Sequence, residues 1–254
     1  MELNEKFIEP IGYSKAAEYL KAIVDSPVFA QMDGHISGVF KAEKLTKWVG
    51  QKNVKGILFW FCNSGSSTIP TLAVQKIMKE YQDSSDWLAS LLPNRPVVHI
   101  KGLRMVSDVI KKNYHYDIPL KDILNDIQNE DPLKVNAFYF RDSGNVDAMR
   151  DQFRSNYSTN VNFPFAYFST AYGKGSPYFE QFLKQGDVPF IRYYLGYSKD
   201  SVFTGQQIRL ILAPCKADGS NLKDNECTPK HLEKFNGAIL LQNSWPPKPQ
   251  ILTE

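Results

Sequence analysis

Cys62 is the residue whose position best suits covalent chemistry. It closes a hydrophobic run, residues 56–62, that has the composition of a buried strand. A cysteine hydrolase also needs a histidine base, which can be distant in sequence, and His35, His99 or His115 could supply it. The alternative is a small buried hydrophobic residue at a strand end. We favour this alternative and assign no catalytic residue.

Cys215, Cys227 and His231 are the next residues considered, because the spacing of Cys227 and His231 suits a zinc site. No CxxC pair accompanies them, and a fourth ligand would have to come from a distant residue such as Cys62. A surface loop explains the same residues. The sequence therefore predicts no metal site.

Two further patterns have simple structural explanations. The Gly-rich stretch 173–176 resembles loops that present backbone N–H groups to phosphate. It lacks the first glycine of the Walker pattern, and a turn with Ser176 capping a helix that begins at Pro177 is favoured. Asp122 and Asp126, one helical turn apart, indicate a solvated helix face. No cofactor is expected.

Composition limits the classes of partner. The chain has 254 residues and a net charge of +3 from 30 basic and 27 acidic side chains, with no basic stripe of the kind that binds nucleic acid. No stretch of about 18 apolar residues is present, and residues 1–10 do not resemble an export signal. Three cysteines in unlike settings favour reduced thiols. We expect a folded cytoplasmic protein with neither nucleic-acid nor membrane partners.

An internal repetition is the most informative pattern in the sequence. Residues 53–65 align with residues 132–144 after a shift of 79 positions, and more weakly with a third stretch after a shift of 134. The second shift places the pair Phe59-Trp60 on Tyr193-Tyr194. The repeat predicts that related strands occur in different parts of the chain.

Hydrophobic periodicity predicts helices alternating with short strands. A helix is predicted before Pro27, and another after Asp142-Ser143-Gly144. In both cases a strand, a short helix and a hairpin are predicted to follow. Helices are expected near residues 14–24, 45–49, 75–92, 106–127, 146–157 and 179–183, and strands near 35–40, 56–61, 71–74, 96–100, 137–140, 163–168, 190–197 and 207–214.

These elements predict an α+β fold built from repeated helix-strand-helix-hairpin units in a mixed or antiparallel sheet. The first predicted lobe is 1–144, with a repeat unit at 14–74 and a partial second copy at 106–144. The second is 145–254, with a repeat unit at 146–213 and a proline-rich tail. Whether the units form two lobes or one continuous sheet is left open.

The C-terminal part resembles a group of uncharacterised bacterial proteins common in Bacteroidetes. The shared features are an aromatic strand at 191–197, a hydrophobic strand at 208–214, a turn at Asp218-Gly219 and a proline-rich end at Pro246-Pro247. The cysteines that often flank the prolines in that group are absent here. The resemblance implies a fold unit and implies no catalytic residue.

Trp60, Tyr139 and Tyr194 occupy equivalent positions in the repeat and are the candidate binding residues. They share a strand face, and Phe59 and Tyr193 lie on the opposite face, which is the predicted main core. Polar-tipped aromatics are common where one side meets a partner, but we favour the alternative that helices cover this face. For Trp60 we predict burial, because the neighbouring Leu58 on its face is also apolar.

Two functions therefore stay open. The first is a non-enzymatic protein that binds a protein or a small molecule, or that takes part in an assembly. The second is a hydrolase that uses Cys62. The sequence favours the first.

Overall fold

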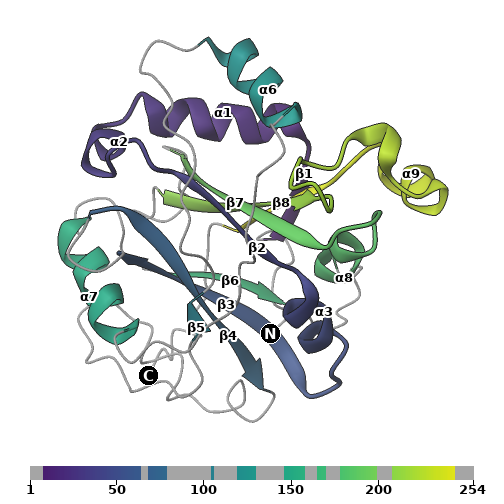
Figure 1. Ribbon diagram of the computed structural model, residues 1–254, viewed down its shortest axis with the longest axis horizontal. Helices are drawn as coiled ribbons and strands as arrows, with labels where there is room; N and C mark the ends of the chain where they lie inside the picture. Colours follow the sequence, from purple (N-terminus) through teal and green to yellow (C-terminus); the bar gives the residue numbers. More distant parts are fainter. Residues whose placement is uncertain are drawn as a thin grey trace, which may run out of the picture.

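The computed structural model describes residues 8–63, 68–78, 104–105, 119–129, 146–157, 165–169, 178–198 and 208–243. The protein has an α+β fold in which two antiparallel sheets pack against each other and helices lie around them (Figure 1). Among the described residues, no helix is both long enough and apolar enough to cross a membrane.

The chain builds its elements in a simple order. The first part contains β1 (Ile8–Ile11), α1 (Tyr13–Val24), α2 (Pro27–Gln31), β2 (Ser37–Lys41), α3 (Glu43–Val49), β3 (Val54–Asn63), β4 (Pro70–Met78), β5 (Arg104–Met105) and α6 (Leu120–Gln128). The second contains α7 (Val146–Asn156), β6 (Phe165–Ser169), α8 (Tyr178–Leu183), β7 (Phe190–Tyr197), β8 (Ile208–Cys215), the 3₁₀ helix η2 (Asp224–Glu226), α9 (Pro229–Phe235) and β9 (Leu240–Asn243).

Each sheet combines strands from both parts of the chain. The five-stranded sheet has the order β1-β9-β8-β7-β2, and the four-stranded sheet has the order β5-β4-β3-β6. The hairpin β7–β8 thus takes β2 as its third strand, and the hairpin β3–β4 takes β6. The predicted boundary between residues 144 and 145 therefore does not separate one sheet from the other.

The two hairpins have the same pairing register. Trp60 lies opposite Phe165, the first residue of β6, and Tyr194 lies opposite Ser37, the first residue of β2. On the other side, Phe59 and Tyr193 each lie opposite the fifth residue of the partner strand. Element order and register agree with the repeat units predicted at 14–74 and 146–213. The internal repeat itself stays a prediction, and most of the partial copy at 106–144 lies outside the described residues.

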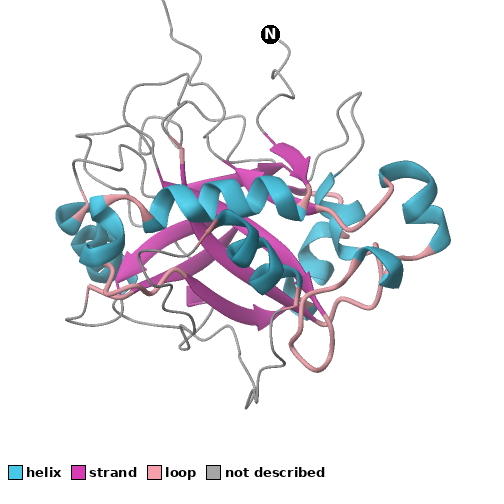
Figure 2. Cartoon of the chain, turned by 90° about the horizontal axis from the view of Figure 1, so that it is seen from above, coloured by secondary structure: helices cyan, strands magenta, loops and turns pink. Residues whose placement is uncertain are grey.

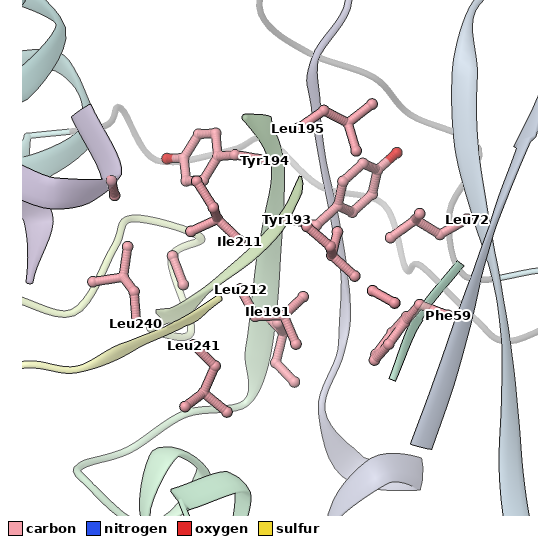
Figure 3. Close-up of a cluster of buried hydrophobic side chains, with 14 of the residues drawn as sticks. Phe59, Leu72, Ile191, Tyr193, Tyr194, Leu195, Ile211, Leu212, Leu240 and Leu241 are labelled. Carbon is pink, nitrogen blue, oxygen red and sulfur yellow. The ribbon is translucent and has the colours of Figure 1, made fainter. Parts of the chain in front are cut away.

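The main core lies between the sheets. Figure 3 shows Ile191 and Tyr193 of β7 pointing towards Phe59 and Leu72, while Tyr194 points to the other side of its sheet. The ring of Phe40 on β2 lies 6.0 Å from that of Phe59. The alternation of large side chains in β3 and β7 arises because strand side chains point to opposite faces in turn. The predicted core face is thus correct for Phe59 and Tyr193, which are both buried.

Helix α1 lies on the outer face of the five-stranded sheet, where it packs mainly on β7 (Figure 2). Its buried stripe includes Ala17, Leu20 and Val24, which recur at helical spacing. The helix comes close because β7 has Gly196 beneath it, where an added Cβ would lie 2.8 Å from Cβ of Tyr19. The predicted helix at 14–24 is confirmed to within one residue.

One predicted boundary is wrong. The helical pattern predicted from residue 75 begins inside β4, which continues as a strand to Met78. Gln75 and Lys76 pair with Leu58 and Ile57 of β3. The backbone hydrogen bonds between β4 and the central strand β3 outweigh the weak local preference of these residues for a helix. The remainder of the predicted helix lies outside the described residues.

The contact between Gly38 and Tyr193 joins the two parts of the chain and gives the first testable prediction. A Cβ at residue 38 would lie 2.6 Å from the Tyr193 ring. Gly38→Val should therefore lower the free energy of unfolding by about 1–3 kcal/mol through overpacking. Calorimetry should show one transition for both proteins, because each sheet combines strands from both parts of the chain.

The matched control is Gly50→Ala, where the added Cβ meets ordinary contacts no closer than 3.6 Å. Two separated transitions, or a Gly38→Val variant as stable as the control, would contradict the interlocked sheets.

Candidate functional site

Trp60 and Tyr194, two of the candidate binding residues, are buried. Trp60 is 2% exposed, packs on Phe165 at 5.2 Å and has the guanidinium of Arg150 at 5.1 Å from its ring. Tyr194 is fully buried, and its hydroxyl accepts a hydrogen bond of 2.9 Å from Asn221. The burial predicted for Trp60 is confirmed.

The proposed aromatic surface therefore needs correction for its two described members. Side chains from α7 and from β6 cover Trp60, and Asn221 covers Tyr194, so neither ring faces solvent. The third member, Tyr139, lies outside the described residues.

Truncating Trp60 measures this burial directly. Trp60→Ala should lower the free energy of unfolding by about 3–5 kcal/mol, because a buried aromatic ring is lost and a cavity is left. Denaturant unfolding would measure the change. Trp60→Phe, which keeps an aromatic ring against Phe165 and removes the indole N–H group, should cost markedly less. Equal stability of Trp60→Ala and the parent protein would show that the ring is not part of the core.

Cys62 lies at the end of β3 and is fully buried. Its sulfur is 3.8 Å from the carbonyl oxygen of Trp60. Of the three histidines considered as a base, His35 lies in the turn before β2 with its Nδ1 atom 3.9 Å from Asp33, and His99 and His115 lie outside the described residues.

The residues considered for zinc have other roles. The Cys215 sulfur lies 3.2 Å from Oδ1 of Asn221, and His231 Nε2 bonds the carbonyl oxygen of Gly237 at 3.0 Å. Burial raises the pKa of Cys215 and of Cys227 to about 11, so both are neutral thiols near pH 7. No group of three metal-ligand side chains occurs in the part of the chain that the structure describes.

The other two patterns give no site. Residues 173–176 lie outside the described residues. Asp122 and Asp126 lie on α6, where Asp122 is exposed and Asp126 half-buried. This fits the solvated helix face expected from their spacing.

A cleft of about 300 Å³ lies where α1 begins. It is lined by residues 10–14, by Gln128 at the end of α6, by Asp224 of η2 and by residues 235–239. In Figure 1 these elements meet beside β1 and α9. The lining combines apolar side chains, such as Ile11 and Ile239, with backbone groups and polar side chains.

Three side chains from different elements hold one wall of the cleft. His231 on α9 bonds the carbonyl of Gly237, and Asp224 accepts the N–H of Ala238 at 2.8 Å. Gln185, after α8, accepts the N–H of Ile239 at 2.7 Å and donates to its carbonyl at 2.9 Å. Three consecutive residues are thus fixed through their backbone. These three side chains preorganise the cleft wall.

Glycine is required at one position of this wall. A Cβ at residue 237 would lie 2.8 Å from Oδ1 of Asp224. The preceding Asn236 is left-handed, with φ 55°, and ends α9. The short Asn-Gly turn therefore lets the chain leave α9 and pass close to the Asp224 carboxylate.

Tyr13 is another fixed part of the lining. Its side chain is 5% exposed, and its hydroxyl donates to the carbonyl oxygen of Leu222 at 2.6 Å. Burial, and then the neighbouring Cys215, raise the pKa of Tyr13 well above its usual value. The phenol therefore stays protonated and keeps its donor role at any pH where the protein is used.

Gln185 is the strongest of these anchors and gives the next prediction. Its fully buried amide makes three hydrogen bonds, two to Ile239 and one to the carbonyl of Phe182. Gln185→Ala leaves these backbone groups without their partner, so we expect a loss of about 2–4 kcal/mol in the free energy of unfolding.

Hydrogen exchange provides the specific readout, because the amide of Ile239 should lose protection beyond the global change. Lys184→Ala, at an exposed neighbouring side chain, is the control. Unchanged protection of Ile239 in Gln185→Ala would show that the wall does not depend on this amide.

Sequence reasoning missed this cleft. Its lining comes from five separate elements, none of which carries a motif. The pair Asn236-Gly237 was a usable signal, since Asn or Gly at a helix end marks a left-handed turn. Nothing in the local sequence distinguishes Gln185, whose partners are distant in the chain.

Comparisons of this chain with protein-family models, with curated proteins and with solved structures found no match. The resemblance of the C-terminal part to Bacteroidetes proteins therefore stays an expectation. The function has to be argued from the geometry alone.

Proposed function

We propose that this protein is a non-enzymatic binding protein that holds a small molecule in the cleft between α1 and residues 235–239. The observation that carries the proposal is the preorganised wall, in which the backbones of Gly237, Ala238 and Ile239 are each fixed by a side chain. A wall held in this way loses little entropy when a ligand binds.

The size and lining of the cleft support a small ligand. Its volume of about 300 Å³ is at the lower end of the range for ligand pockets. Ile11 and Ile239 offer apolar contacts, and Gln128 and Asp224 offer polar ones. Such a combination orients a small molecule that has both an apolar and a polar part.

A protein partner has less support. Leu120, 41% exposed, is the one large hydrophobic side chain that is exposed in the described part of the chain. Protein interfaces normally include a contiguous apolar patch with buried anchor residues. The described surface offers no such patch, and we therefore place a small molecule before a protein.

The alternative of a hydrolase that uses Cys62 also has less support. The thiol is fully buried at the end of a core strand, so a substrate would have to displace core side chains to reach it. The binding proposal includes a cytoplasmic setting without nucleic-acid partners. Free cysteines at positions 62, 215 and 227 and the nearly balanced charge support both.

A variant that fills the cleft tests the proposal. Gly12 lines the cleft, and an added Cβ there meets no atom within 4 Å. Gly12→Phe should therefore fold normally and block ligand entry. We expect a screen of small amines, alcohols and carboxylic acids, followed by amide NMR, to shift the resonances of Gly12, Gly237 and Ala238 in the parent protein.

Gly12→Ala is the matched control, because its single methyl group leaves most of the cleft open. Compounds that shift the Gly237 and Ala238 amides in Gly12→Ala should lose at least about tenfold in affinity in Gly12→Phe. A screen in which no compound shifts these amides, or in which Gly12→Phe binds as tightly as the control, rules out this cleft as the binding site.

A further inference from the structure

We infer, on the basis of the proposed function, that the ligand of the cleft carries a positively charged ammonium group that binds Asp224. Asp224 is the one charged side chain among the described residues that line the cleft. The inference thus concerns the chemical class of the ligand.

The Asp224 carboxylate is held in a defined orientation. Its Oδ1 atom accepts the N–H of Ala238 at 2.8 Å. Because Gly237 has no side chain, the carboxylate lies against the backbone, where a Cβ would be 2.8 Å from Oδ1 and 3.5 Å from Oδ2. One oxygen is engaged in the wall, and the second accepts no hydrogen bond from the residues that the structure describes. Hydrogen bonds between ionised groups are the strong ones.

The surrounding charges leave this carboxylate as the dominant charge of the lining. Lys216, on the nearby turn, is paired with Glu226 at 2.8 Å. Lys234 lies 5.1 Å from the ring of Phe235 and is not part of the lining. No lysine, arginine or histidine side chain lines the cleft in the described part of the chain.

Apolar side chains complete the lining. Ile11 and Ile239 would contact the hydrocarbon part of the same molecule. The lining therefore suits a small primary amine with a short apolar chain.

One feature of the cleft favours a negatively charged ligand. Helix α1 begins at Tyr13, and a helix start attracts negative groups. Three probes of the same carbon skeleton separate the two preferences: 3-methylbutylamine, 3-methylbutanol and 3-methylbutanoate. They share five carbons and differ in the polar group, which is cationic, neutral or anionic near pH 7.

Titration of each probe followed by amide NMR measures the three affinities. We expect the amine to bind most tightly, and Asp224→Asn to weaken it by about tenfold. An asparagine at this position can still accept the Ala238 N–H group, so the variant should fold. Glu233→Gln removes the same charge from an exposed side chain of α9 outside the lining and should leave the affinity unchanged.

The outcomes separate this inference from the proposed function. If the alcohol or the carboxylate binds at the cleft as tightly as the amine, or if Asp224→Asn leaves amine binding unchanged, the ammonium assignment is wrong and the binding site stands. If the amine shifts no cleft amide, the assignment also fails, and the wider compound screen decides the proposed function by itself.

Discussion

The reciprocal pairing of β2 with β7 and of β6 with β3 is the constraint on which the rest of the structure depends. Each two-stranded hairpin receives its third strand from the other part of the chain. An isolated hairpin is marginal in water, and a third strand with a buried face makes it stable. Neither sheet is therefore complete until both parts of the chain are in place.

The exchange also determines where the core lies. Because β2 and β6 both connect to the opposite sheet through short helices, the sheets must lie face to face. Phe40 of β2 then meets Phe59 of β3, and Phe168 of β6 meets the same ring at 5.7 Å. The exchanged strands thus supply aromatic rings to the shared core, and the pairing and the packing reinforce each other.

The cleft depends on the five-stranded sheet rather than on the four-stranded one. Helix α1 is positioned by its packing on β7, where Gly196 allows a close approach. Strand β9 is positioned by pairing with both β1 and β8. The start of α1 and the residues before β9 are therefore held at one edge of the same sheet. The cleft forms between them, and side chains such as Gln185 then fix its wall.

The sequence predicted much of this fold because its strongest signals are local. Alternating apolar residues in 56–61 and 190–197 marked β3 and β7, and the shift of 134 positions matched Phe59 with Tyr193, whose pairing registers agree. The strand exchange was not predictable in this way. Two similar units that keep their own strands and two units that exchange them have the same periodicity, and only tertiary packing distinguishes them.

The candidate site was less accessible for a related reason. The prediction began from residues that could react, and Trp60 and Cys62 drew attention because they lie in the most regular strand of the repeat. A regular strand with large side chains on both faces is the kind that becomes buried on both sides.

The cleft instead depends on residues whose roles involve backbone groups far away in the chain, such as Gln185 with Ile239 and Tyr13 with Leu222. A buried amide or phenol needs hydrogen-bond partners. The sequence does not reveal which distant residue supplies them. In this protein such hydrogen bonds shape the site, because they fix the backbone between α9 and β9, which is not part of a helix or a sheet. These contacts can be recognised only once the fold is known. The core could therefore be predicted from the sequence, whereas the cleft could be found only in the structure.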